Sequence, residues 1–134
     1  MERQKKVVDA SIVLKWFIDE IGSEDAVVFL QEHVAGNSLL IAPDLLFLEV
    51  LNVLRFKKKN EKELLNVLKE LQELQLHIQK ITPEILEKTI HFALQYNLTI
   101  YDALYVATAT IHGAPLITDD KEILKVPSAV ALRK

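Results

Sequence analysis

Cysteine is absent from this 134-residue sequence, and glycine and proline are scarce, with three and four residues respectively. The lack of cysteine excludes a disulfide framework, and the low glycine and proline content excludes collagen-like and disordered chains. Half of the residues are hydrophobic, and a chain of this length can bury a core without a disulfide or a structural metal. We therefore predict a single globular domain over residues 1–134.

The sequence also lacks any apolar stretch long enough to span a membrane. Its start contains no secretory hydrophobic region, because Asp9 follows only two apolar residues. We therefore expect a cytoplasmic protein with no membrane contact. The formal net charge of −3 is unusual for a nucleic-acid-binding protein. If four acids belong to an internal site, however, the remaining surface is almost neutral and leaves room for a local basic patch.

Short apolar strands alternate with helices along the whole chain. We predict strands at residues 6–9, 39–41, 76–81, 116–118 and 130–132. Capping residues predict helices that begin at Ser23, Asn60, Thr82 and Thr99. Another helix is expected to have Pro43 in its first turn and to end at residues 57–59. Strands separated by helices favour an α/β fold with a central parallel sheet that has helices on both faces.

Acidic residues lie at the ends of two predicted strands. Asp9 ends the first strand, and Asp119 and Asp120 follow the fourth. In a parallel sheet, functional sites form beyond the carboxyl ends of the strands. We therefore expect these aspartates to meet at one edge of the sheet.

Two further acids lie inside apolar helices. Glu49 is in the middle of residues 43–56, and Asp102 is in residues 100–111, two segments that are apolar around almost their whole circumference. A buried carboxylate without a partner is unstable, and neither segment has a basic residue placed to neutralise its acid. If these acids join Asp9 and Asp119 or Asp120, a cation is needed among them. Oxygen ligands alone favour Mg²⁺ or Mn²⁺ over zinc.

Each acid also has a purely structural explanation. Asp9 could form a turn or cap a helix, Asp102 could favour a helix N-terminus, and Asp119 or Asp120 could cap a short helix through Leu124. Glu49 is the hardest to explain in this way, since it lies in the middle of a helix. Four independent coincidences would be needed to explain all of these positions without a shared site.

Four stretches of the sequence resemble the PIN-domain ribonucleases, in particular the VapC-type toxins of prokaryotic toxin–antitoxin pairs. They are VVDASIVLKWF (residues 7–17), APDLLFLEVLNVLR (42–55), LTIYDALYVATA (98–109) and PLITDD (115–120). They occur in the order of the family. The resemblance implies a three-layer α/β/α sandwich and an endoribonuclease that uses Mg²⁺ or Mn²⁺.

The resemblance also implies site residues. The catalytic acids of the family fall on Asp9, Glu49, Asp102 and Asp120. The implied metal ligands are Asp9, Asp102 and Asp120 or its neighbour Asp119, because the Thr-x-Asp motif of the family here has an acid at both positions. Small polar residues near the metal match Ser11 and Thr118. Asn52 lies one helical turn after Glu49 and is expected to support the site or orient the substrate.

In chemical terms, the implied reaction is direct attack by a metal-activated water, which yields a 5′-phosphate and a 3′-hydroxyl. The basic residues that could hold the RNA backbone are Lys15, Arg55, Lys57, Lys58 and Lys59. The four basic residues at positions 55–59 have an alternative explanation. Their positive charges could complement the dipole at the C-terminus of a helix and keep the following turn soluble. Tyr101 and Tyr105 could stack on RNA bases, but both are expected in the core because their helix is so apolar. The four histidines are expected at the surface or as caps, because they show no ligand-like spacing.

A cognate antitoxin and a second copy of the chain are the protein partners that the resemblance implies. The alternative function is a non-catalytic PIN-like module that binds RNA or protein. A receiver or a haloacid-dehalogenase-like phosphatase fits poorly, since the latter needs Asp-x-Asp after its first strand where this chain has Asp9-Ala10-Ser11.

Overall fold

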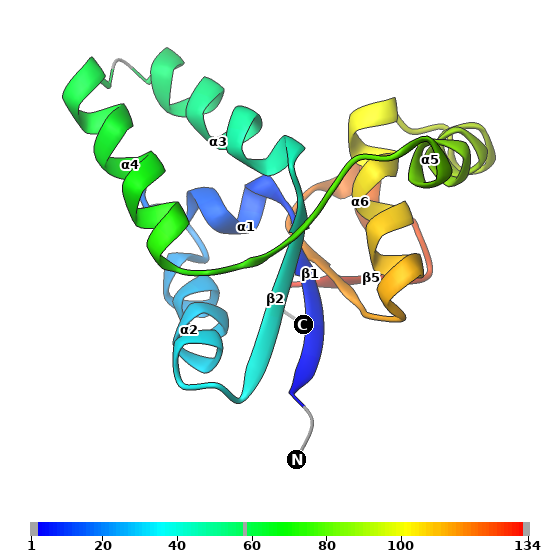
Figure 1. The fold of residues 1–134 in the computed structure, drawn as a ribbon, viewed down its shortest axis with the longest axis horizontal. Coiled ribbons are helices and arrows are strands. Elements are labelled where there is room, and N and C mark those ends of the chain that lie inside the picture. Colours follow the sequence, from blue (N-terminus) through cyan, green and yellow to red (C-terminus); the bar gives the residue numbers. More distant parts are fainter. Residues whose placement is uncertain (1–2, 58, 133–134) are drawn as a thin grey trace.

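A computed structural model describes residues 3–57 and 59–132. Five parallel strands form one sheet in the order β3-β2-β1-β4-β5 (Figure 1). The strands are β1 (Gln4–Val8), β2 (Ser38–Pro43), β3 (His77–Gln79), β4 (Leu116–Thr118) and β5 (Ala129–Ala131). The predicted parallel sheet is therefore confirmed. The ends of β4 agree with the prediction, and those of the other strands differ from it by one or two residues.

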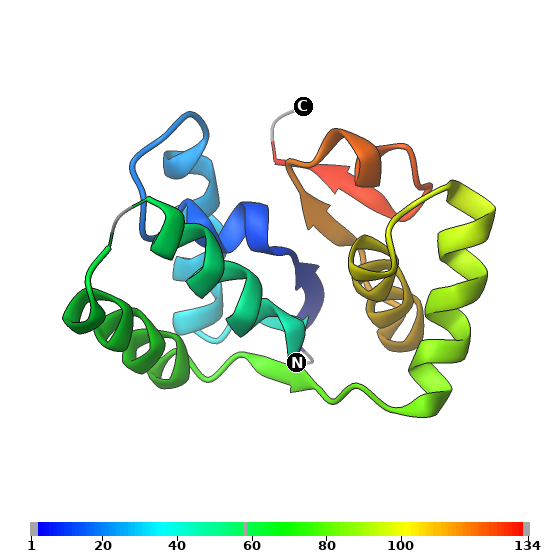
Figure 2. The ribbon, with the colours of Figure 1, turned by 90° about the horizontal axis from the view of Figure 1, so that it is seen from above.

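Helices cover both faces of the sheet, as predicted (Figure 2). One face carries α1 (Ala10–Leu14), α2 (Ser23–Val34), α3 (Leu45–Phe56) and α4 (Glu61–Glu73). The other carries α5 (Pro83–Tyr96), α6 (Ile100–His112) and α7 (Lys121–Leu124). Successive strand residues point to opposite faces, so Val8 packs in the first layer and Val7 in the second. This arrangement is the three-layer α/β/α sandwich.

The predicted caps of α4, α5 and α6 are confirmed. Asn60 and Glu63 form a reciprocal capping box at the start of α4, and the Thr82 and Thr99 hydroxyls accept hydrogen bonds from the first turns of α5 and α6. Helix α6 ends at Gly113, which has a φ of 59°. No helix in the described part of the chain is long and apolar enough to cross a membrane.

Two helix starts differ from the prediction. Pro43 is the last residue of β2 and is paired with Gln79 of β3, so strand pairing overrides its preference for a first helical turn. Ser23 is the first residue of α2 and not its cap. Its hydroxyl accepts from the Glu20 amide at 3.0 Å and donates to the Ile18 carbonyl at 2.9 Å, so it closes the preceding loop instead.

Candidate active site

The carboxyl edge of the sheet brings together acids from four separate elements. Asp9 lies between β1 and α1, and Asp120 lies between β4 and α7. Glu49 is in the first half of α3 and Asp102 is in the first turn of α6, on opposite faces of the sheet (Figures 1 and 2). The charge of Asp120 raises the pKa values of Asp9, Glu49 and Asp102, as described below, so Asp120 acts on the other three acids.

Asp9 is held in place from several directions. It is only 3% exposed. Oδ1 accepts hydrogen bonds from the Ser11 hydroxyl at 2.6 Å and the Ile12 amide at 3.2 Å, and Oδ2 accepts from the Thr118 hydroxyl. Burial nevertheless raises the pKa of Asp9 to about 6, because these hydrogen bonds offset only part of the desolvation and the charge of Asp120 adds to it.

The same two hydroxyls position the loop after β4. The Ser11 Oγ accepts a hydrogen bond from the Asp119 amide at 2.9 Å, and the Thr118 Oγ1 accepts one from the Asp120 amide at 3.0 Å. Each hydroxyl therefore links one oxygen of Asp9 to the backbone of one of the consecutive aspartates. Ser11 and Thr118 thus orient both Asp9 and the neighbouring loop.

Glu49 is half-buried, and the Tyr105 hydroxyl donates a hydrogen bond to its Oε1 at 2.6 Å. Burial raises the pKa of Glu49, and the charges of Asp102 and Asp120 raise it further, whereas the Tyr105 hydrogen bond lowers it. Burial and the neighbouring carboxylates strongly raise the pKa of Tyr105, so the phenol keeps its proton and remains a donor. Tyr105 is a core residue as predicted, but its contact with Glu49 was missed, because the two residues are 56 positions apart.

Replacing Tyr105 by phenylalanine tests this contact. The aromatic ring and its packing stay, and only the donor to Glu49 is lost. We expect the pKa of Glu49 to rise further, and the free energy of unfolding at pH 7 to fall by about 1–2 kcal/mol. Carboxyl titration by NMR and chemical denaturation measure these two effects. In contrast to the prediction, Tyr101 is exposed, because the buried part of α6 begins only at Ala103. Tyr101→Phe is therefore the matched control, and an unchanged Glu49 pKa in Tyr105→Phe would contradict the assignment.

Asp102 is partly buried in the first turn of α6, where its amide donates to the Thr99 hydroxyl at 3.0 Å. Burial raises the pKa of Asp102, and the charges of Asp120 and Glu122 raise it further. Its position does complement the helix N-terminus, as the structural explanation required. That explanation is incomplete, because a favourable helix dipole would lower this pKa, whereas it is raised.

The two consecutive aspartates differ in their surroundings. Asp120 caps α7 by accepting from the Glu122 amide at 2.8 Å, and its charge raises the pKa values of Asp9, Glu49 and Asp102. Asp119 instead forms an ion pair with Lys15 at 3.3 Å. The structure therefore connects Asp120, and not Asp119, with the other acids.

The oxygen-only donor set suits a hard divalent cation. In the described part of the chain, no Lys, Arg or His forms an ion pair with Asp9, Glu49, Asp102 or Asp120, so their repulsion is uncompensated within the protein. No three His, Asp or Glu side chains among residues 3–57 and 59–132 are placed so that they could already hold a metal ion. The charges therefore fit a divalent cation, and side-chain adjustment is needed before the acids could share one.

The predicted RNA-backbone contacts are scattered. Lys15 is buried and its ammonium is already engaged by protein groups. Arg55 and Lys57 are exposed at the far end of α3 from the sheet, and Lys59 pairs with Glu63 at 3.5 Å (Figure 1). Lys58 lies outside the described residues. Asn52 is exposed one turn after Glu49. The contacts to RNA remain predictions.

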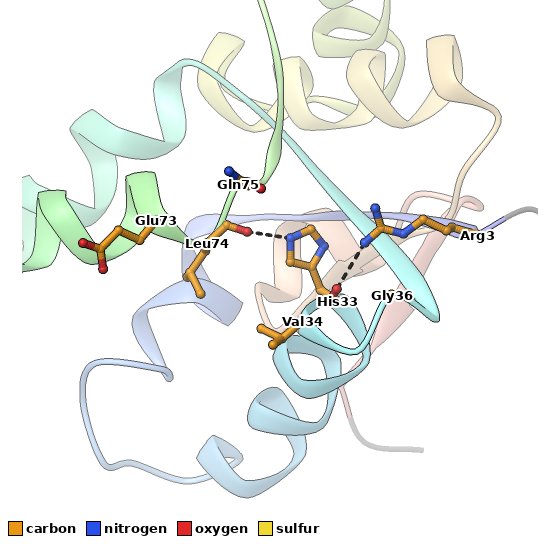
Figure 3. Close-up of a pocket in the computed structure, with 7 residues that line it drawn as sticks. All are labelled: Arg3, His33, Val34, Gly36, Glu73, Leu74 and Gln75. Carbon is orange, nitrogen blue, oxygen red and sulfur yellow. Dashed lines mark hydrogen bonds between the residues drawn. The ribbon is translucent and has the colours of Figure 1, made fainter.

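A separate pocket lies near the amino ends of the strands, between Arg3, His33 and Gln75 (Figure 3). His33 is buried there, in contrast to the predicted surface position. Its Nδ1 accepts from the Leu40 amide at 3.1 Å, and its Nε2 lies 2.8 Å from the Leu74 carbonyl, so the ring joins two backbone groups. Arg3 donates to the carbonyls of His33 and Ser38. These contacts make the pocket part of the scaffold.

The three-layer fold, with coupled acids at the carboxyl edge of its sheet, defines a class of α/β/α proteins with an acidic site. The sequence profile of the PIN domain matches residues 6–129, and the chain belongs to the PIN domain family. The resemblance found in the sequence is thereby confirmed.

Relatives of similar length support this assignment. The chain is 35% identical to ribonuclease VapC3 of Pyrobaculum aerophilum over 135 residues, which covers 94% of this chain and 98% of the relative. It is 32% identical to ribonuclease VapC1 of Mycobacterium tuberculosis over 125 residues, covering 90% of each. A toxin–antitoxin complex from Klebsiella pneumoniae contains a chain of the same fold, with a TM-score of 0.75, 20% identity and coverage of 96% of this chain and 98% of that one.

Proposed function

We propose that this protein is a divalent-metal-dependent endoribonuclease and the toxin of a type II toxin–antitoxin pair. The observation that carries the proposal is that Asp9, Glu49, Asp102 and Asp120 interact at one edge of the sheet, while no cation among the described residues forms an ion pair with them. Two relatives that the chain matches over most of their length are named ribonucleases.

Mg²⁺ or Mn²⁺ would be held by Asp9, Asp102 and Asp120, with Glu49 beside them. A bound ion of this kind supplies Lewis acidity, which polarises a phosphoryl oxygen and lowers the pKa of a water molecule. Ser11 and Thr118 keep the oxygens of Asp9 directed by their hydrogen bonds. Tyr105 fixes the orientation of Glu49 through its hydroxyl.

Glu49 has the surroundings of a general base. The pKa of Glu49 is raised toward neutral pH, and a carboxylate with a higher pKa is a stronger base. In the proposed hydrolysis, the water oxygen bonds to phosphorus and its proton passes to Glu49. The bond from phosphorus to O3′ breaks, and O3′ takes up a proton. The products are therefore a 5′-phosphate and a 3′-hydroxyl.

Cleavage of a panel of RNAs tests the proposal. We expect cutting with Mn²⁺ or Mg²⁺, none with a chelator, and a loss of at least about 100-fold in Asp102→Asn, since one metal ligand would be removed. Asp44→Asn is the matched control, because Asp44 is an exposed acid at the start of α3 outside the site. Equal cutting by wild type and Asp102→Asn would remove the active-site assignment, and a 2′,3′-cyclic phosphate product would exclude the direct attack of water.

The absence of a preformed group of three metal ligands in the described residues favours a second candidate, a non-catalytic module that binds RNA or protein. The cleavage assay described above distinguishes the two candidates. A binding module would cut no RNA of the panel at any concentration of Mn²⁺, and a module that binds RNA would still shift it in a gel.

Two protein partners are part of the proposal. A cognate antitoxin is supported by the chain of the same fold in a toxin–antitoxin complex. It is tested by co-purification with the product of the adjacent open reading frame. A homodimer is supported by Leu86, Ile90 and Leu94, which form an exposed apolar stripe at helical spacing on α5. Light scattering of the purified protein determines whether the mass is that of one chain or two.

A further inference from the structure

Lys15 is a buried cation next to the acidic site. It is 7% exposed, and its ammonium group donates two hydrogen bonds and forms an ion pair with Asp119. Nζ lies 3.1 Å from Glu20 Oε1, 2.8 Å from the Ile21 carbonyl and 3.3 Å from Asp119 Oδ2. Lys15 therefore joins α1, the loop before α2 and the loop after β4.

The surrounding loop is shaped around the lysine side chain. Gly22 has a φ of 91°, a conformation that favours glycine. A Cβ atom at this position would lie 3.4 Å from Lys15 Cε and 3.0 Å from Leu132 Cδ2. The chain therefore passes in van der Waals contact with the alkyl part of Lys15.

Lys15 separates two carboxylates that the backbone places together. The amides of Asp119 and Asp120 bond to Ser11 and Thr118, which both bond to Asp9. A single hydroxyl group thus connects the backbone amide of each of these two aspartates to the carboxylate of Asp9. The carboxylate of Asp119 lies 3.3 Å from the Lys15 ammonium, whereas that of Asp120 accepts from the Glu122 amide and forms no ion pair with a described residue.

We infer that Lys15 is a positioning residue that keeps Asp119 away from the ion and leaves Asp120 as the ligand. This inference rests on the proposed metal-dependent function. An unpaired Asp119 beside a divalent cation would be drawn to it, since opposite charges attract strongly at short range in a partly buried site. The ammonium of Lys15 neutralises this carboxylate in place. Lys15 is correspondingly unsuited to contact an RNA phosphate, because its side chain is buried and two carboxylates balance its charge.

Binding of Mn²⁺, followed by electron paramagnetic resonance and calorimetry without RNA, tests the inference. In the wild-type background, Asp119→Asn is expected to change the Mn²⁺ dissociation constant by less than about twofold, and Asp120→Asn to raise it about tenfold or more. In a Lys15→Met background, Asp119 is free to reach the ion. There we expect Asp119→Asn to raise the dissociation constant about fivefold or more, a coupling that a double-mutant cycle isolates.

Glu20→Gln is the matched control, because it removes another acidic partner of Lys15 and leaves the pair with Asp119. In this background we expect Asp119→Asn to remain without effect. A merely structural role of Lys15 would lower stability equally in both Lys15→Met variants and give no coupling. If Lys15→Met does not fold, Lys15→Gln takes its place in the double-mutant cycle, since glutamine removes the charge but keeps a polar end for the Ile21 carbonyl.

The outcomes separate this inference from the proposed function. Mn²⁺ binding with equal effects of Asp119→Asn and Asp120→Asn, or with no coupling to Lys15, would overturn the role of Lys15 and leave the metal site intact. A wild-type protein that binds no Mn²⁺ would overturn both. A Lys15→Met variant that weakens RNA binding, with unchanged Mn²⁺ affinity and no coupling, would make Lys15 a substrate contact instead.

Discussion

Asp9→Asn is expected to lower the Mn²⁺-dependent cleavage of RNA by about 1,000-fold or more. Asp9 is the most buried of the four acids and is held by Ser11, Thr118 and the Ile12 amide. An asparagine keeps the size of the side chain but loses the charge that would bind the ion. A metal ion contributes several kcal/mol to the transition state of phosphoryl hydrolysis, and about 4 kcal/mol corresponds to a factor of 1,000.

Stability measurements distinguish this loss of activity from unfolding. Because the pKa of Asp9 is raised to about 6, most of the Asp9 side chains are charged at pH 7 in an environment that disfavours the charge. Asp9→Asn removes this unfavourable charge, so the melting temperature in the absence of metal is expected to equal or exceed that of the wild type. A folded Asp9→Asn variant that cuts RNA at the wild-type rate would contradict the role of Asp9.

Without a divalent cation, the stability of the wild type is expected to fall as the pH rises from about 4 to about 6. Asp9 binds a proton more tightly in the folded than in the unfolded state, since its pKa rises from 3.8 to about 6 on folding. The folded state therefore carries more protons in this window, and the free energy of unfolding decreases with increasing pH, by about 3 kcal/mol for Asp9. The raised pKa values of Glu49 and Asp102 act in the same direction.

Adding Mn²⁺ at pH 7 is expected to reverse this loss, because an ion bound only by the folded state adds about 3 kcal/mol at one hundred times its dissociation constant. Thermal unfolding at pH 4.5 and pH 7, with Mn²⁺ or with a chelator, measures both effects. Asp9→Asn is the control and should show a weaker dependence on pH and on Mn²⁺. A metal-free wild type that becomes more stable from pH 4 to pH 6 would contradict the raised pKa values.

Local patterns in the sequence were enough to predict most of the secondary structure. The capping box at Asn60 and the caps at Thr82 and Thr99 were predicted correctly, because they depend on residues within one helical turn. Pro43 was assigned to the wrong element, since its conformation depends on pairing with Gln79 on another strand. His33 was misplaced for a similar reason, because its two partners come from β2 and the end of α4.

The acidic site was only partly predictable. Glu49 and Asp102 were noticeable in the sequence because they interrupt apolar helices, and Asp9 because it ends a strand. Tyr105 gave no such signal, since an aromatic residue in an apolar helix is usually a core residue. The proximity of Lys15 to Asp9 in the sequence predicted a phosphate contact, which stays a prediction. The sequence did not reveal that the Lys15 ammonium is buried between Glu20, Ile21 and Asp119.

The sequence by itself determined the alternation of strands and helices and the positions of the acids within them, because periodicity and capping act over a few residues. Only the tertiary structure decided which groups meet. It joined Glu49 to Tyr105, and it directed Asp119 to Lys15 while Asp120 remained with the other acids. Hydrogen bonds and charges act through space over a few ångströms, and the distance between two side chains is set by the packing of the sheet and its helices.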